Sequence, residues 1–315
     1  MQVGLMISSS NVVPSDLDRM IAEAVEAEAL GFDSVWMPLG FVQHGAPALF
    51  GHDPITTLAA VAGATEGIEL GTAILPIQHR HPIITAQHAL SLSALSNDRF
   101  TLGLGNSHRH LVAHVLGLNW DAPMTQMRDY LAVIDVALSG SVMSYQGDCY
   151  RVQDALMPGA DDREIRRPSI LLSAMGPAML RLAGALTDGT ITGFTGPRTL
   201  ESHIVPTMRA AAAQADRKEP RIVASVQFAL TDDVQATRER IAPLLAGYGG
   251  MPSYRAMLDR EGVENPADLV VAGDAKTIGD ALRRLQDIGV TDVLASTSNS
   301  ATSRQTKEVL VDFTR

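Results

Sequence analysis

The sequence has a single cysteine, Cys149, among its 315 residues. One thiol cannot form an intramolecular disulfide, and it cannot supply the cysteine pairs of a structural metal site. Long apolar runs are also missing, since none approaches the roughly 20 residues that a membrane helix needs. The segment Met1–Ser8 lacks the basic leader of a signal peptide and has the pattern of a first strand. We therefore expect a cytoplasmic protein that does not enter a membrane.

Positively charged residues are few. The chain has 25 Lys and Arg residues against 35 Asp and Glu residues, and its formal net charge is -10. A nucleic-acid-binding surface needs a concentration of basic residues on one face, so this composition argues against a nucleic-acid partner. The expected partner is a small-molecule substrate.

Short, nearly continuous apolar runs alternate with helical patterns along the whole chain. The predicted strands are Gln2–Ile7, Ser34–Met37, Ile68–Leu75, Phe100–Leu104, Ser169–Ser173, Thr190–Phe194, Ile222–Ala229 and Asp292–Ala295. Continuous apolar character is typical of parallel strands that are buried on both faces. After a first helix that opens at Pro14-Ser15-Asp16, helices are predicted near 54–65, 83–96, 122–139, 177–186, 198–215, 234–246 and 275–288. Eight strand–helix units without a linker predict one (β/α)8 TIM barrel over residues 1–315, an α/β fold, with insertions at 38–53 and 247–272.

The first predicted helix shows how the helix boundaries are marked. It opens at Pro14-Ser15-Asp16, because proline suits the first turn of a helix and Ser15 with Asp18 makes a capping pair. Apolar residues then recur at intervals of three and four, which is the pattern of one buried face. Gly31 follows as the left-handed residue that ends the helix.

In a barrel of this kind, catalytic residues lie on the loops after the carboxyl ends of the strands, and several chemistries lack their residues there. No lysine lies at the end of a predicted strand, so a Schiff-base aldolase is not expected. The first strand has no His-x-His pair and no ordered set of carboxylates follows, which argues against a metal-dependent hydrolase. A glycosidase needs two carboxylates at strand ends. Asp53 and Asp188 are better explained as helix caps or loop residues.

Histidines gather on the loops after predicted strands two to four. Six of the nine lie there, namely His44, His52, His79, His81, His108 and His110. One interpretation is an electropositive wall for an anionic cofactor, made of His79, Arg80, His81, His108 and Arg109, with one imidazole as a proton donor. The alternative is that these histidines cap helices or bond to backbone carbonyls.

Two turns have the composition of phosphate sites. Ser173-Ala174-Met175-Gly176-Pro177 joins a strand to a helix through small residues, so that free N–H groups meet the positive end of the helix dipole. Thr195-Gly196-Pro197 is a similar turn and a candidate second contact. In the third strand, Leu70-Gly71-Thr72 places a glycine among small residues, which marks either a close approach to a ligand or a tightly packed position.

Five short motifs resemble, in the same order, those of the luciferase-like flavin-dependent oxidoreductases. They are residues 31–36 (GFDSVW), 70–72 (LGT), 81–82 (HP), 99–105 (RFTLGLG) and 168–176, the last followed by Leu182-Ala183 and Asp188-Gly189. The resemblance covers roughly residues 1–200 well and the rest loosely. It implies a (β/α)8 barrel with insertions, commonly a homodimer. The turns at 173–177 and 192–198 are most similar to the branch that uses the deazaflavin coenzyme F420.

The resemblance also implies where a cofactor binds. Ala73-Ile74 corresponds to a non-proline cis peptide behind the flavin ring, the strand-four loop lies near the ring, and the two glycine turns contact phosphate. The implied cofactor-binding residues are Thr72, Ala73, Ile74, Asn106, Ser107, Ser173, Ala174, Met175, Gly176, Thr195 and Gly196.

At two positions the chain departs from the deazaflavin enzymes that it resembles. Many of them have Asp-His after the second-strand tryptophan, where this chain has Leu39-Gly40, and His108 replaces a glutamate often found after strand four. Their acid–base residues are therefore not transferred to this chain. His108 and His44 are the candidate catalytic residues, as proton donors to the substrate.

Three functions agree with these features. The first is an oxidoreductase that transfers hydride between C5 of coenzyme F420 and a small organic substrate. The others are an FMN-dependent monooxygenase and a non-catalytic flavin-binding relative. The expected pocket walls are Trp36, Met37, Phe41, Phe194, Phe228 and Met251, which favour a fairly apolar substrate.

Overall fold

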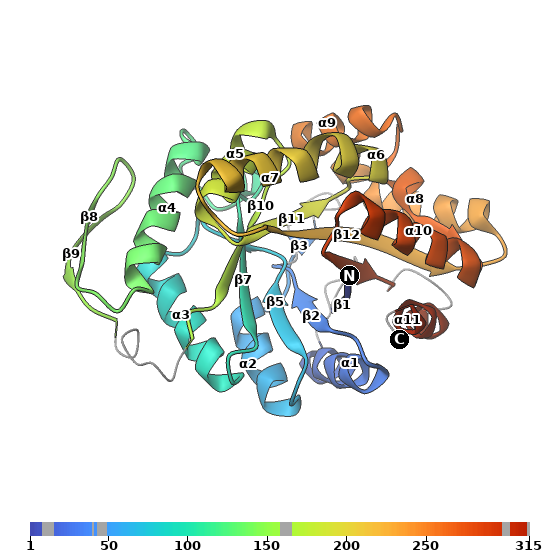
Figure 1. Cartoon of the computed structure of the whole chain (residues 1–315), viewed down its shortest axis with the longest axis horizontal. Helices are drawn as coiled ribbons and strands as arrows, with labels where there is room; N and C mark the ends of the chain where they lie inside the picture. Colours follow the sequence, from blue (N-terminus) through green and yellow to red (C-terminus); the bar gives the residue numbers. More distant parts are fainter. Residues whose placement is uncertain (8–15, 40, 43–48, 158–165, 298–302, 314–315) are drawn as a thin grey trace.

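Eight parallel strands form the centre of the molecule (Figure 1). The computed structural model describes residues 1–7, 16–39, 41–42, 49–157, 166–297 and 303–313. The eight strands are β1 (Gln2–Met6), β2 (Ser34–Met37), β5 (Glu69–Thr72), β7 (Phe100–Gly105), β10 (Ser169–Ser173), β11 (Gly189–Gly193), β12 (Arg221–Leu230) and β14 (Asp292–Ser296). Each pairs with the next in this order, and β14 pairs with β1. The ring therefore closes, which confirms the predicted barrel.

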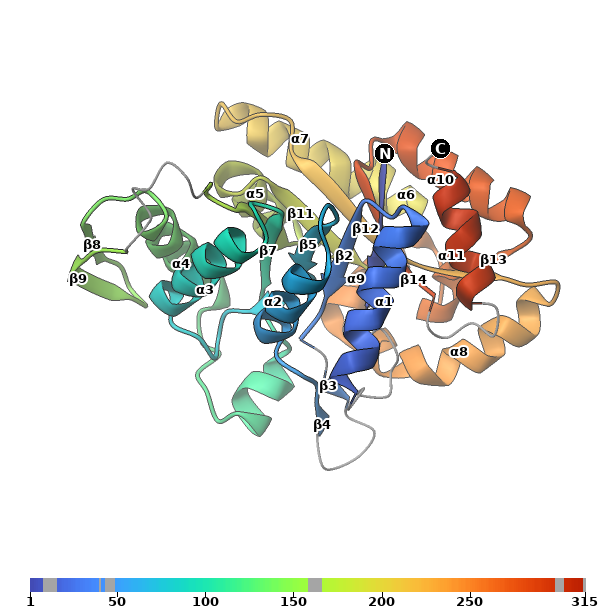
Figure 2. The same ribbon diagram turned by 90° about the horizontal axis from the view of Figure 1, so that it is seen from below.

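Helices surround this ring (Figure 2). The longer ones are α1 (Leu17–Leu30), α2 (Pro54–Ala64), α3 (Pro82–Leu95), α4 (Pro123–Ala137), α5 (Pro177–Leu186), α7 (Val205–Gln214), α8 (Val234–Gly249), α9 (Pro252–Glu261), α10 (Ala275–Ile288) and α11 (Ser303–Asp312). The short ones are α6 (Pro197–Thr199), the π-helical turns η1 (His110–Val115) and η2 (Leu200–Ile204), and the 3₁₀ turn η3 (Pro266–Leu269). Within the described residues, none combines the length and apolar character of a membrane span.

Helix α10 illustrates why these segments are helical. Its buried residues are Ile278, Leu282, Leu285 and Ile288, which recur at intervals of three and four and form one face. Burial of each such side chain contributes about 1.5–3 kcal/mol. The carboxylate of Asp274 caps the first turn by accepting from the Thr277 N–H at 2.8 Å.

Two predicted elements are divided in the structure, and one predicted helix has a different cap. The third strand, predicted as one run, is divided into β5 and β6 (Leu75–Pro76) by a cis peptide between Ala73 and Ile74. The helix predicted at 198–215 is divided among α6, η2 and α7. Helix α1 is capped by Asp16, whose carboxylate accepts from the Arg19 N–H, whereas Ser15, the predicted cap, lies outside the described residues. Gly31 ends α1 with φ 98°, as predicted.

The segments between barrel strands hold several small elements. In the span 38–53, β3 (Phe41–Val42) pairs antiparallel with β4 (Leu49–Phe50). An unpredicted hairpin, β8 (Met143–Gln146) and β9 (Arg151–Ala155), projects beside α4 (Figure 1). Residues 234–273 contain α8, α9, η3 and β13 (Val271–Gly273), and β13 pairs with β12. We call residues 234–273 the covering segment, because it lies over one end of the barrel. It includes the insertion expected at 247–272.

The interior of the barrel is filled around Trp36. This indole is 1% exposed and packs with Leu171, Ile191, Val223 and Leu294, which come from four other strands. Its Nε1–H donates to the Ser34 hydroxyl at 2.8 Å. A Cβ atom on Gly71 would lie 2.2 Å from the indole, so the glycine on strand β5 is required by packing.

Below the indole, charged residues close the amino-terminal end of the barrel. Arg221 Nη1 lies 2.8 Å from Glu69 Oε1, and its Nη2 lies 2.5 Å from Asp292 Oδ1. The guanidinium carbon is 6.0 Å from the centroid of Trp36. Burial alone would lower the pKa of Arg221, but its bonds to both carboxylates raise that pKa above its usual value. The guanidinium therefore links strands β5, β12 and β14.

We predict that Gly71→Ala lowers the free energy of unfolding by about 1–3 kcal/mol, because the new methyl group overlaps the buried indole. Chemical denaturation measures this change. Gly63→Ala is the matched control: nothing lies within 4 Å of a Cβ at this position in α2, so it should be neutral or slightly stabilising. Equal effects of the two substitutions would contradict the packing role of Gly71.

Candidate functional site

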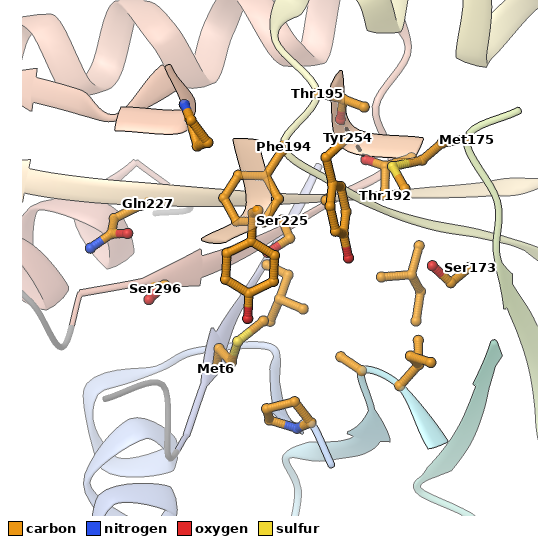
Figure 3. A pocket seen from close by; sticks show the side chains of 18 of the residues that line it. Met6, Ser173, Met175, Thr192, Phe194, Thr195, Ser225, Gln227, Tyr254 and Ser296 are labelled. Carbon is orange, nitrogen blue, oxygen red and sulfur yellow. Dashed lines mark hydrogen bonds between the residues drawn. The ribbon is translucent and has the colours of Figure 1, made fainter. Parts of the chain in front are cut away.

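A cavity of about 330 Å³ opens at the carboxyl ends of the barrel strands (Figure 3). This is the end at which barrel enzymes carry their active sites. Strand residues that line it include Met6, Ser173, Gly193, Ser225 and Ser296. The covering segment contributes Leu245, Tyr248, Tyr254, Pro266, Leu269 and Val270. Among the described lining residues there is no Lys, Arg, Asp or Glu, so the walls are neutral.

The wall formed by Ala73 and Ile74 agrees with the expected geometry. Their peptide bond is cis, as the resemblance implied, and both side chains line the cavity. A Cβ atom on Gly105 would lie 2.5 Å from Ile74 Cδ1, so this glycine leaves room for the isoleucine. Thr72, by contrast, does not line the cavity. Its hydroxyl donates to the Gly103 carbonyl at 2.8 Å and accepts from the Gly103 N–H at 2.9 Å, which joins β5 to β7.

Asn106 and Ser107 both line the cavity, on the loop after β7. A residue that the sequence analysis did not select, Gln78, holds this loop. Its Nε2–H donates to Asn106 Oδ1 at 2.7 Å, and its Oε1 accepts from the Ser107 N–H at 3.1 Å. This bond fixes the orientation of the Asn106 amide, whose NH2 group can donate to a ligand.

His108 is the only predicted catalytic residue that the structure describes, since His44 lies outside the described residues. The imidazole lines the cavity, and burial lowers its pKa below the usual value of 6.5. It is therefore mainly neutral at pH 7. Its ring meets Tyr254 edge-on, with the centroids 5.6 Å apart, and Tyr248 at 6.4 Å.

The rings of His108, Phe194, Tyr248 and Tyr254 pack together on one side of the cavity, and we call them the aromatic cluster. Phe194 lies 4.8 Å from Tyr248 and 5.0 Å from Tyr254, measured between centroids. Its φ of 53° is in the left-handed region, which is unusual for a bulky residue and recurs at ligand sites. Phe194 is among the pocket residues predicted from the sequence, whereas the two tyrosines are not. Their position in the insertion expected at 247–272 was the available signal.

The predicted phosphate turn after β10 is partly in the cavity wall. Ser173 and Met175 line the cavity, Ala174 is buried in the core, and Gly176 is the N-cap of α5. No side chain caps this helix among the described residues, and a Cβ on Gly176 would meet nothing within 4 Å. His203, which is 8% exposed, lies with its Nε2 2.8 Å from the Met175 carbonyl oxygen and donates to it. An open, uncapped helix end is available to an anion.

The second predicted turn, Thr195-Gly196, is arranged differently. Thr195 lines the cavity, and its hydroxyl is 2.8 Å from that of Thr192. Gly196 is outside the lining and is the N-cap of α6. The carboxylate of Glu261 accepts from the Arg198 N–H at 3.1 Å and from the Thr199 N–H at 2.7 Å. A side chain of the covering segment therefore already occupies the N-terminus of α6.

The histidine–arginine groups do not form a charged wall at the cavity. Arg80 is paired with Asp53, which also caps α2 by accepting from the Thr56 N–H. His81 caps α3 through the Ile83 N–H at 3.3 Å, and neither His79 nor Arg109 lines the cavity. For these residues the interpretation as helix caps and loop structure agrees better with the geometry. The positive charge expected beside a cofactor is absent from the described lining.

Of the expected apolar wall residues whose side chains the structure describes, only Phe194 lines the cavity. Trp36 lies below it in the barrel interior, while Met37 and Phe228 are buried in the core. Met251 is outside the lining, and the side chain of Phe41 lies outside the described part of the structure. The assignments of Trp36, Met37 and Phe228 were wrong because strand position alone does not separate the cavity wall from the barrel interior or from the layer beneath the helices.

Comparisons with known proteins agree with this arrangement. The family model described as luciferase-like monooxygenase matches residues 1–312. A 5,10-methylenetetrahydromethanopterin reductase of Methanolobus tindarius is 30% identical over 272 residues, or 85% of this chain and 78% of that protein. An F420-dependent glucose-6-phosphate dehydrogenase of Beutenbergia cavernae is 29% identical over 284 residues, which is 87% of this chain and 80% of that protein. A solved F420-dependent secondary alcohol dehydrogenase, in complex with an F420–acetone adduct, has the same fold, with a TM-score of 0.81. It is 19% identical, and the superposition covers 99% of this chain and 97% of that chain.

We predict that acidification destabilises the folded chain through His108. Because burial lowers the folded-state pKa, the unfolded chain binds the proton more readily, and stability is lost as the pH falls from 6.5 toward the folded-state pKa. The free energy of unfolding should therefore fall less between pH 7 and pH 5 in His108→Gln than in the wild type. Urea denaturation at both pH values measures the difference. An identical pH dependence in the two proteins would contradict a buried neutral imidazole.

Proposed function

This chain belongs to the luciferase-like monooxygenase family, and on that premise we propose that it is an oxidoreductase that uses coenzyme F420 and acts on a small, fairly apolar organic substrate. The observation that carries the proposal is the neutral cavity at the carboxyl ends of the strands, which joins the Ala73–Ile74 wall to the open turn at Ser173–Gly176. The F420-dependent enzymes among its relatives support the choice of cofactor.

The residues present fit such a cofactor. The uncapped N-terminus of α5 offers N–H groups for a phosphate, and Gly176 leaves space beside it. Ala73 and Ile74 offer an apolar surface for a planar ring, and the Asn106 amide can donate to its polar edge. When bound, the deazaflavin supplies hydride transfer at its C5 position. The second turn contributes through Thr195, since Glu261 occupies the N–H groups of α6.

The chain itself supplies orientation, exclusion of water and a proton. The covering segment places Tyr248 and Tyr254 over the cavity, which shields the reacting atoms from solvent. Burial lowers the pKa of His108, so its imidazolium form is a minor but stronger acid, and this protonated form is the one that can deliver a proton to the substrate. We retain His44 as the second candidate proton donor. We also propose that the chain acts as a homodimer in the cytoplasm, as the family resemblance implied, and light scattering of the purified protein tests the dimer.

The cofactor proposal predicts a difference between two titrations. Purified protein should quench the fluorescence of oxidised F420 with a dissociation constant in the micromolar range or below, and should bind FMN at least about tenfold more weakly, a gap of roughly 1.4 kcal/mol. Preference for FMN would favour an oxygen-activating monooxygenase instead. Binding of neither cofactor would remove the flavin chemistry and leave only the fold.

The proton-donor proposal predicts the effect of two alanine substitutions. With a substrate found by screening enones, imines and alcohols, His108→Ala should lower kcat by about 100-fold, the scale of one general acid, and should leave F420 binding nearly unchanged. His44→Ala tests the alternative donor, and His114→Ala, a histidine outside the described lining, is the control. Unaltered rates in both His108→Ala and His44→Ala would remove the proposal.

A further inference from the structure

Tyr254 occupies a defined position above the end of β11. A Cβ atom on Gly193 would lie 3.9 Å from Tyr254 Cε1, which is ordinary contact, so the phenol ring lies one methyl group away from this glycine. On its other sides the ring meets Phe194, Tyr248 and His108 at centroid distances of 5.0, 5.5 and 5.6 Å. Figure 3 shows its hydroxyl directed toward the open centre of the cavity, between Met6 and Ser173.

Helix α9, which carries Tyr254, is anchored to the loop after β11. Both oxygens of Glu261 accept backbone N–H groups of α6, and the Thr199 hydroxyl donates to Glu261 Oε2 at 2.7 Å. The Thr199 hydroxyl also lies 3.3 Å from the Met257 carbonyl oxygen. These contacts lie one and two turns along α9 from Tyr254 and hold the phenol before any ligand arrives. A preorganised donor avoids part of the ordering cost of binding.

The hydroxyl of Tyr254 makes no hydrogen bond to any residue in the described ranges of the chain. Burial, together with the neighbouring Tyr248, raises the pKa of Tyr254 above its usual value. The phenol therefore keeps its proton at neutral pH. It can donate to an acceptor in the cavity but cannot act there as an anion.

We propose that the Tyr254 hydroxyl is a substrate-binding donor that selects uncharged substrates carrying a carbonyl oxygen. The described lining holds no Lys or Arg to pair with a carboxylate or phosphate, and the open N-terminus of α5 is assigned to the cofactor phosphate, so an anionic substrate beside the bound cofactor would lose its hydration without compensation. A carbonyl oxygen needs only one neutral donor. The rings of Phe194 and Tyr248 offer an apolar surface for the rest of such a molecule. The inference rests on the proposed function in taking this cavity as the substrate site.

Three probes of nearly equal shape test the selection. Acetophenone carries the acceptor oxygen, α-methylstyrene replaces it with a CH2 group, and benzoate replaces the methyl ketone with a carboxylate. Their affinities are measured by ligand-observed NMR, with the wild type and Tyr254→Phe, in the absence of cofactor and after addition of F420. Tyr150→Phe is the matched control, because this tyrosine hydroxyl accepts from Gln126 outside the cavity lining.

We expect Tyr254→Phe to weaken acetophenone binding about five- to tenfold, which corresponds to one neutral hydrogen bond, and to leave α-methylstyrene binding unchanged or slightly tighter. Tyr150→Phe should change neither. With F420 bound, benzoate should bind less tightly than acetophenone to the wild type. Equal losses for acetophenone and α-methylstyrene, or no loss for either, would overturn the inference, and so would benzoate binding as tight as that of acetophenone in the presence of F420.

The two proposals fail separately. If the wild type does not bind F420, the proposed function fails, while the ratio of acetophenone to α-methylstyrene affinity measured without cofactor still reports on Tyr254. If F420 binds and the ratio does not change in Tyr254→Phe, only the role of Tyr254 is removed. Thermal unfolding verifies that the variant is folded, and Tyr254→Met, which also lacks the hydroxyl, should reproduce the loss of acetophenone affinity.

Discussion

Trp36 lies in the middle of the barrel and separates its two ends, the charged cluster around Arg221 and the cavity. A ring of eight strands leaves an interior that side chains must fill at close to crystalline density. Here the indole fills it together with four aliphatic side chains. Glycine on each neighbouring strand makes room for the ring, since Cβ atoms on Gly4 and Gly71 would lie 3.0 and 2.2 Å from it. Beneath the indole, Arg221 and its two carboxylates close the amino-terminal end. Above it, the strands are free to line a cavity.

The cavity is neutral because the strands and the covering segment both line it with uncharged side chains. The strands contribute small and polar uncharged groups, such as Ser173 and Ser225, while the covering segment contributes rings. Charged residues near this end of the barrel have their partners outside the cavity. Arg80 pairs with Asp53, and Glu261 accepts from the Thr199 N–H of α6. An unpaired charge in a wall of this kind would lose its hydration at a large cost in free energy. The polar groups of the site are therefore hydroxyl, amide and imidazole groups.

Much of the fold could be predicted because its signals are local. A continuous apolar run, a glycine at the end of a helix such as Gly31, and an aspartate before a helix such as Asp53 each act within a few residues. The site depends on contacts between distant parts of the chain. Whether a histidine after a strand turns into the cavity, as His108 does, or caps the next helix, as His81 does, is decided by packing that spacing does not encode. Tyr254 reaches the cavity through a helix inserted between two barrel strands, so no strand-end pattern indicated it.

The bond between Glu261 and the Thr199 N–H joins residues 62 apart in sequence. Helix α6 therefore receives its cap only after α9 has taken its place over the barrel. An amide hydrogen that is bonded only in the closed arrangement exchanges with solvent when that arrangement opens. The exchange rate of this one amide hydrogen thus reports how often the contact between α9 and α6 opens.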